Sequence, residues 1–158
     1  MPNAINGVVK NSPNDTYGAP SAVMRSVSTP VNSSRMDLYW DVDSSMDADF
    51  STKYFVVLYF AEVETLQQNE FRQFDVLLDS ITLAKGFRPE PMLTTVLTGT
   101  VQGSGNHVIS LVAALNSKQP LISAMEIFLV RSQNESATDS RDGTYWNFLF
   151  ILVYPHHN

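Results

Sequence analysis

The sequence predicts an all-β protein, built as an antiparallel β-sandwich. Short segments with strand patterns recur along the chain, turn residues separate them, and no segment has the apolar spacing of a helix. The 158 residues suit one domain with a core of useful size. Hydrophobic residues make up 44% and charged residues only 16%, which is typical of a β-rich extracellular module and not of a charged helical bundle.

The predicted strands differ in how their apolar residues are arranged. Met36–Val42 alternates between apolar and polar residues, which indicates a half-buried strand. Tyr54–Val63 is a continuous run rich in β-branched and aromatic residues, which predicts a central strand covered on both faces. The other strand segments are Arg72–Ala84, Leu93–Val101, His107–Leu115 and Leu121–Val130, with turns at "GFRPEP" (Gly86–Pro91) and a hairpin-type turn at "QGSGN" (Gln102–Asn106).

Changes in composition divide the chain into four parts. We expect a lead-in loop over residues 1–16, the sandwich over 17–131, a polar linker over 132–143 and a divergent apolar tail over 144–158. The apolar run Phe148–Tyr154 is too short to span a bilayer, which takes about 20 apolar residues. The N-terminal residues "MPNAINGVVK" lack the apolar stretch of a signal peptide.

Charge and residue types argue against several functional classes. The net charge of −6 and the lack of a basic stripe argue against a nucleic-acid partner. The sequence has no cysteine for a disulfide, a thiolate zinc site or a nucleophile. It has no Gly-x-Ser-x-Gly elbow, and Ser104 lies in a Gly-Ser-Gly stretch that a turn explains. We therefore predict no catalytic residue, no metal site and no cofactor.

Two acidic features leave alternatives open. The stretch Asp41–Asp49 has oxygen ligands at alternate positions, as in a calcium loop, but Met46 stands where that loop needs Gly and Thr52 where it needs Glu. A solvated acidic loop is favoured there, and a weak calcium site is the alternative. Glu62 and Glu64 share one face of a strand end, where solvated side chains are favoured over the paired acids of a glycosidase.

Aromatic side chains and glycosylation sequons are the remaining candidates for recognition. Tyr39, Phe71 and Phe87 are candidates for stacking on a sugar ring, and core packing or a lone surface aromatic is the alternative for each. The pattern Asn-x-Ser/Thr begins at Asn14, Asn32 and Asn134.

One long stretch resembles a known family. "YFAEVETLQQNEFRQFDVLLD" (Tyr59–Asp79) resembles the malectin-like domain of plant leucine-rich-repeat receptor-like kinases, in which a strand ending in Tyr/His-Phe-Ala-Glu is followed by a polar link and then Arg-Glu/Gln-Phe. Upstream, "YGAPSAVMRSVSTPVNSS" is similar to the family's lead-in, and downstream "QPLISAMEIFLV" is similar to its closing strand. The resemblance covers about Tyr17–Asp142.

The resemblance implies a sandwich of the malectin type, which is jelly-roll-like, and a role in recognition. It implies a non-catalytic extracellular module of a receptor-like kinase that binds carbohydrate, such as a cell-wall glycan, or a peptide ligand. As part of a full-length receptor it would lie at the extracellular face of the plasma membrane; the family's serine/threonine kinase domain is absent from this chain. The alternative is a protein-interaction fragment, or a soluble decoy, that pairs with a receptor or co-receptor.

The sequence also departs from the family. It resembles the second of two tandem halves, apparently in a truncated form, and the residues after Asp142 fit nothing in the family. The family's Asn-Gly hairpin is replaced by Asp79-Ser80, so the sequence does not support a turn there.

Overall fold

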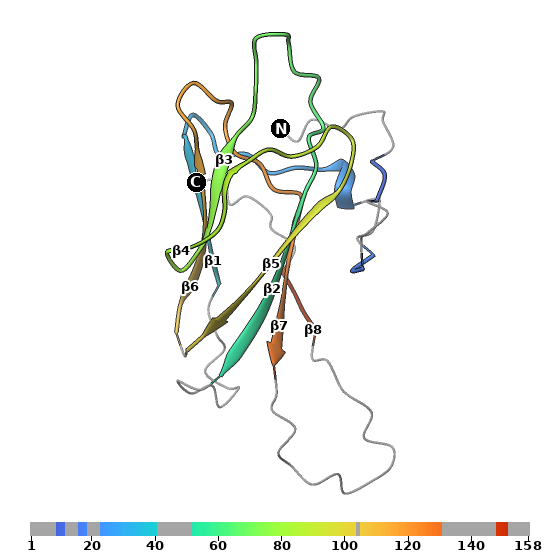
Figure 1. The fold of residues 1–158 in the computed structure, drawn as a ribbon. Helices are drawn as coiled ribbons and strands as arrows, with labels where there is room; N and C mark the ends of the chain where they lie inside the picture. Colours follow the sequence, from blue (N-terminus) through green and yellow to red (C-terminus); the bar gives the residue numbers. More distant parts are fainter. Residues whose placement is uncertain are drawn as a thin grey trace, which may run out of the picture.

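Two antiparallel four-stranded sheets pack face to face in the part of the chain that the structure describes, and this confirms the predicted sandwich (Figure 1). The structure is a computed structural model, and it describes residues 9–11, 16–18, 23–40, 52–103, 105–130 and, for the backbone, 148–151. The first sheet contains, in spatial order, β1 (Arg35–Trp40), β6 (His107–Ala113), β3 (Phe74–Leu78) and β4 (Ile81–Phe87). The second contains β5 (Thr95–Gln102), β2 (Lys53–Phe60), β7 (Ala124–Val130) and β8 (Phe148–Ile151).

The central strand β2 is covered on both faces, as its continuous apolar run predicts. Val56 and Leu58 face the first sheet and belong to the core between the sheets. Val57 and Tyr59 point to the other face, where they join a second buried cluster. Met24, from a short 3-10 turn at Val23–Arg25, covers that cluster. One strand thus connects two apolar clusters, which explains why its sequence does not alternate.

The core between the sheets contains an aromatic group at one end. Phe60 of β2 and Phe74 of β3 are fully buried, and their ring centroids lie 5.8 Å apart. Phe87 of β4 lies 4.9 Å from Phe60 and 5.5 Å from Phe74. Such tilted and edge-on arrangements stabilise aromatic pairs beyond the area that they bury. The group therefore links both sheets through side chains distant in sequence.

The predicted hairpin at "QGSGN" is wrong. β5 pairs with β2 in the second sheet, whereas β6 pairs with β1 and β3 in the first, so the connection crosses from one sheet to the other. Gly103 and Gly105 have φ values of 140° and 135°, which favour glycine, and Ser104 lies outside the described residues. A Gly-rich sequence predicts a tight turn but does not decide which sheet the next strand joins.

The prediction of one strand over Arg72–Ala84 is also wrong, because the segment contains the β3–β4 hairpin. Asp79 and Ser80 form its turn with φ values of 48° and 77°, both in the left-handed region that two-residue hairpins use. The Asp79 carboxylate accepts a hydrogen bond from Val108 N (2.8 Å), and Asp79 N donates to Val108 O (2.9 Å). These bonds from β6 hold a turn that the local sequence does not support.

Replacing Ser80 by Gly is expected to stabilise the protein by up to about 1 kcal/mol. The left-handed conformation costs a residue with a Cβ about 1–2 kcal/mol, and part of this gain is offset by the greater chain entropy of Gly. Urea unfolding of Ser80→Gly beside the parent chain measures the change. Asp79→Gly is the control, because it removes the carboxylate that binds Val108 N and should not stabilise. A lower midpoint for Ser80→Gly would contradict the expectation.

The strand β8 lies within the segment expected to be a divergent tail. It pairs antiparallel with β7, from Met125 opposite Ile151 to Phe128 opposite Phe148. The expected polar linker over 132–143 and the acidic stretch Asp41–Asp49 lie outside the described residues. Within the described part of the chain, the structure contains no helix long and apolar enough to cross a membrane.

Candidate functional site: a loop end held by a buried arginine

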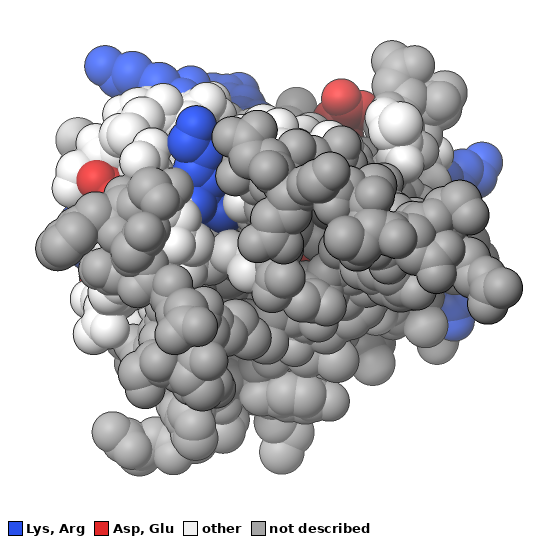
Figure 2. Space-filling model, turned by 90° about the horizontal axis from the view of Figure 1, so that it is seen from below, with Lys and Arg blue, Asp and Glu red and all other residues white. Residues whose placement is uncertain are grey.

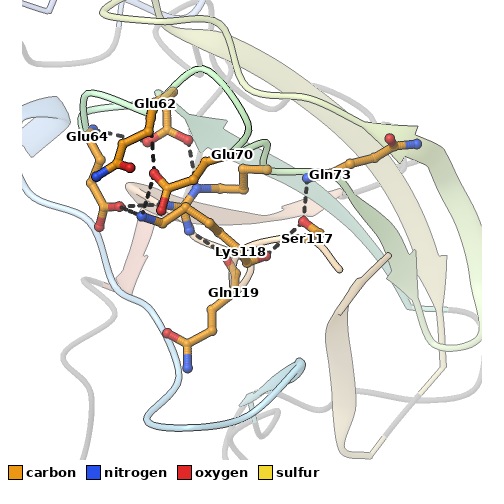
Figure 3. A network of polar contacts seen from close by, with 9 residues as sticks. Glu62, Glu64, Glu70, Gln73, Ser117, Lys118 and Gln119 are labelled. Carbon is orange, nitrogen blue, oxygen red and sulfur yellow. Dashed lines mark hydrogen bonds and ion pairs between the residues drawn. The ribbon is translucent and has the colours of Figure 1, made fainter. Parts of the chain in front are cut away.

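Two loops meet at the end of the sandwich that lies at the top of Figure 1. The first, residues 61–73, connects β2 to β3, and the second, residues 114–123, connects β6 to β7. The backbone N–H of Lys118 donates to the carbonyl of Phe71 at 2.9 Å. Two more hydrogen bonds join the loops, from Ala114 N to Gln73 O (2.8 Å) and from Gln73 N to Ser117 Oγ (2.8 Å; Figure 3).

The Arg72 guanidinium lies at the centre of this end. Its Nε donates to Glu62 Oε2 (2.7 Å), its Nη2 to Glu64 Oε2 (2.9 Å), and its Nη1 to the carbonyl of Gln119 in the second loop. The side chains of Arg72 and Glu62 are each 2% exposed. A charge so deeply buried requires an opposite charge and complete hydrogen bonding. The other Glu62 oxygen accepts from Glu64 N (3.0 Å), so the ion pair fixes the first loop, and the bond from Arg72 to the Gln119 carbonyl ties the second loop to it.

Around this buried ion pair lies a polar rim that solvent reaches, formed by Glu64, Glu70 and Lys118. Lys118 Nζ lies 3.2 Å from Glu64 and 3.5 Å from Glu70 (Figure 3). The hydrogen bond to Glu64 raises the pKa of Lys118. A hydrogen bond from the backbone of Gln67, with the nearby Lys118 charge, lowers the pKa of Glu70. Side-chain exposures between 25% and 35% leave these three groups accessible to a ligand.

The Glu70 charge is expected to stabilise this loop end only above acidic pH. Because folding lowers its pKa from 4.5, its contribution is fully present above that value and is lost as pH falls through the folded pKa. Unfolding midpoints of the parent chain and Glu70→Gln should therefore differ near neutral pH and converge in acid. Urea unfolding from about pH 7 to about pH 3 measures this. A difference that persists unchanged in acid would contradict the sign.

The structure corrects the expectation that Glu62 is solvated. Both Glu62 and Glu64 bind one guanidinium, and Glu62 is closed off from water. A glycosidase needs one carboxyl group that carries a proton and another that reaches the sugar. Two carboxylates that share Arg72 suit a structural ion pair instead. Sequence reasoning missed the role of Arg72, whose signal is its place in the "RQF" motif ten residues beyond Glu62.

Two of the predicted ligand residues lie near this end in different surroundings. Phe71 is half-buried in the first loop, and the Arg88 guanidinium carbon lies 5.5 Å from its ring centroid. Arg88 also donates to Gln73 Oε1 (2.7 Å), which holds it over the ring. Phe87 is partly buried and packs with the aromatic group of the core. Phe71 thus directly follows the rim residue Glu70 in the chain, whereas the ring of Phe87 packs on the core.

The structure does not bring Tyr39 together with the other two. Tyr39 is 69% exposed on β1 and lies opposite Val108 of β6. Phe87 pairs with Phe74 of β3, and Phe74 lies opposite Ala113 of β6. These two places on β6 are about 17 Å apart at about 3.4 Å per residue. Tyr39 is therefore an exposed aromatic residue at the other end of the first sheet.

That other end contains a buried polar group that sequence reasoning did not assign. His107 Nδ1 lies 2.6 Å from Asp79 Oδ2, and its ring packs 5.2 Å from Trp40 and 5.5 Å from Tyr54. Burial raises the pKa of Tyr54. The Asp79 carboxylate thus orients His107 while its other oxygen holds the hairpin turn. The group fastens β6 to the β3–β4 hairpin.

Of the predicted glycosylation sites, Asn32 is described. It is exposed just before β1 and has a φ of 51°, which is a turn conformation. Asn14 and Asn134 lie outside the described residues. In the described part of the chain no three His, Asp or Glu side chains are grouped as a metal site would require. In Figure 2, the visible Lys and Arg atoms form separate groups.

Sequence relatives share the region that forms this fold. The chain is 33% identical over 135 residues to a probable leucine-rich-repeat receptor-like serine/threonine-protein kinase of Arabidopsis thaliana, At1g05700, over 84% of this chain and 15% of the relative. It is 32% identical to the putative kinase At2g04300 of the same plant, over 80% of this chain and 14% of the relative. The chain thus spans only a small part of these relatives.

Solved structures and a family model also match most of this chain. The ANX2 ectodomain of Arabidopsis thaliana has a TM-score of 0.63 at 12% identity, over 81% of this chain and 38% of that one. A structure of the plant peptide RALF23 in complex with FER and LLG2 gives 0.63 at 18% identity, over the same shares. Both confirm a sandwich of the malectin type. The family model of the malectin-like domain matches residues 3–130, and the chain belongs to the malectin-like domain family.

Proposed function

We propose that this chain is a non-catalytic recognition module of a receptor-like kinase and that it takes its ligand at the loop end held by Arg72. The observation that carries the proposal is the buried Arg72, which binds Glu62 in the first loop and the Gln119 carbonyl in the second while the rim groups Glu64, Glu70 and Lys118 stay accessible. Loops held by a rigid sandwich are where binding residues concentrate. Fixed loops also lose little conformational entropy when a ligand binds.

A peptide is the ligand class that this end suits best. The rim places the Lys118 ammonium 3.2 Å from Glu64 and 3.5 Å from Glu70. One cation and two carboxylates so close together can pair with both the negative and the positive charges of a peptide. Phe71 adds a half-buried aromatic surface beside the rim. The similar structure that contains FER also contains the peptide RALF23 and the protein LLG2. A peptide ligand with a co-receptor is therefore proposed for this chain too.

Carbohydrate is the second candidate, and the exposure of Tyr39 favours it. A ring that is 69% exposed can stack on the apolar face of a sugar. Phe87 stays a predicted ligand residue, and its internal contacts make it the weakest of the three. With either ligand, the relatives and the ectodomain structures support a place outside the cell, as part of a receptor. A soluble fragment that pairs with a receptor is the alternative.

Display of the full chain against a random peptide library and a glycan array tests the proposal. We expect saturable peptide binding that Phe71→Ala and Lys118→Gln each weaken about tenfold, the loss of one good contact of about 1.4 kcal/mol. Tyr39→Ala is the matched control, since it removes an exposed aromatic far from the rim. Glycan binding lost in Tyr39→Ala would move the site to β1. Binding unchanged in all three variants would reject both sites.

A further inference from the structure

Three buried polar atoms at the end of the sandwich that contains His107 have no hydrogen-bond partner. In the part of the chain that the structure describes, Trp40 Nε1, Tyr54 Oη and His107 Nε2 are closed off from solvent and make no hydrogen bond. The three residues are only 4–5% exposed. A buried polar group without a partner destabilises the folded state, so native proteins contain few of them. Three such atoms in one place therefore require an explanation.

The three side chains form one group, because their rings pack against each other. The ring centroid of His107 lies 5.2 Å from that of Trp40 and 5.5 Å from that of Tyr54. Trp40 of β1 lies opposite His107 of β6 in the first sheet, whereas Tyr54 belongs to β2 of the second sheet. The polar atoms without partners thus come from both sheets.

Asp79 determines which hydrogen bond His107 can still make. Asp79 Oδ2 lies 2.6 Å from His107 Nδ1, and a carboxylate only accepts, so Nδ1 carries the proton of the neutral ring. The Nε2 atom of that ring is then an acceptor, whereas the Trp40 indole N–H only donates. Burial raises the pKa of Tyr54, so its hydroxyl keeps a proton and can donate. The group thus offers one acceptor and two donors.

We propose that Trp40, Tyr54 and His107 form an internal site for one water molecule, which donates to His107 Nε2 and accepts from the other two groups. A buried water typically makes about three hydrogen bonds to polar groups that would otherwise be unsatisfied. The proposal goes beyond the recognition function proposed above. His107 is the first residue of β6, whereas the loop end held by Arg72 follows the last, Ala113. Failure of either proposal leaves the other intact.

The chemistry of the group favours water over an ion. A cation would meet the indole N–H of Trp40, which cannot accept. An anion would meet the lone pair of His107 Nε2 and the Asp79 carboxylate beyond the ring. A neutral molecule that both donates and accepts satisfies all three atoms, and their closure from solvent limits it to a small one. Water meets both requirements.

A glycine lies beside the ring edge that carries Nε2. A Cβ built on Gly103 would lie 3.8 Å from His107 Cε1, the ring carbon between the two nitrogens. The N–H of Gly103 donates to the carbonyl of Thr52 (3.0 Å), which fixes its backbone next to the start of β2. With a φ of 140° this position also favours glycine. No side chain from position 103 therefore occupies the space next to Nε2.

The first test is a crystal structure of the full chain at a resolution that shows ordered waters. One water should lie about 2.7–3.2 Å from both His107 Nε2 and Tyr54 Oη. It should be within the same range of Trp40 Nε1. A protein group in hydrogen-bond contact with Nε2, or no water between Nε2 and the Tyr54 hydroxyl, would overturn the proposal.

The second test uses the sign of a change in stability. Tyr54→Phe removes the hydroxyl and keeps the ring. If the hydroxyl binds the water, the urea midpoint falls because a hydrogen bond is lost; if it has no partner, the midpoint rises because a buried unsatisfied group is removed. Tyr39→Phe is the matched control, since its ring is 69% exposed. We expect Tyr54→Phe to unfold at lower urea than the parent chain and the control, and an equal or higher midpoint overturns the site.

Discussion

Replacing Arg72 by Met is expected to lower the free energy of unfolding by about 3–5 kcal/mol. Methionine keeps much of the side-chain volume, so the loss comes from charge and hydrogen bonds. The Glu62 carboxylate, 2% exposed, would lose its only charged partner in the described part of the chain, and the Gln119 carbonyl would lose its donor. Since a domain is stable by about 5–15 kcal/mol, urea unfolding should show a large drop in midpoint.

Two controls separate the buried charge from other effects. Arg88→Met removes an exposed guanidinium that contacts Phe71 and Gln73, and it should cost less than about 1 kcal/mol. Arg72→Met combined with Glu62→Met removes both buried charges and should recover much of the loss, because apolar pairs often replace buried ion pairs without penalty. If Arg72→Met costs no more than Arg88→Met, the ion pair does not hold this end of the sandwich.

The same experiment links stability to recognition. Arg72 contacts the rim through Glu64, whose carboxylate it shares with Lys118. A folded Arg72→Met chain should therefore keep the backbone bond between Lys118 and Phe71, but the Glu64 side chain loses the guanidinium that holds it, and the Gln119 carbonyl loses its donor. Peptide binding that falls with Arg72→Met, at a temperature where the variant is folded, supports a positioning role for this residue.

Much of the fold could be predicted because local patterns matched the final burial. The uninterrupted apolar run of β2 predicted a strand covered on both faces, and the two clusters on Val57 and Leu58 are the physical reason. The hairpin at Asp79-Ser80 could not be predicted in this way. Its left-handed turn is held by Val108 of β6, a contact that exists only once the sheet has formed.

The candidate site was less predictable, since it depends on pairs that the sequence does not show. Glu62 and Glu64 alone suggest solvated acids, and only the folded chain brings Arg72 and the Gln119 carbonyl against them. Glu62 and Arg72 belong to the family motif, but the motif does not show which groups they contact. Aromatic residues were recognised by type, but type does not distinguish Phe87, whose ring packs inward, from Tyr39, whose ring is exposed.

Replacing Phe60 by Ala is expected to destabilise the protein by about 3–5 kcal/mol, the usual cost of removing a buried ring. Phe60 is fully buried, and its ring packs against Phe74 of β3 and Phe87 of β4, both in the first sheet. The cavity would open where both sheets meet, next to the loop that carries Glu62, so collapse around it should be limited. Thermal and urea unfolding of Phe60→Ala beside the parent chain measure the loss.

Phe87→Ala is the informative comparison, because it asks whether Phe87 serves the core or a ligand. Partial burial predicts a smaller loss than for Phe60→Ala, and Tyr39→Ala should change stability by less than about 0.5 kcal/mol. If Phe87→Ala destabilises by more than about 1 kcal/mol without changing ligand binding, its ring belongs to the aromatic group of the core. A loss of binding with unchanged stability would instead make Phe87 a ligand contact, and the recognition surface would then extend from the rim onto β4.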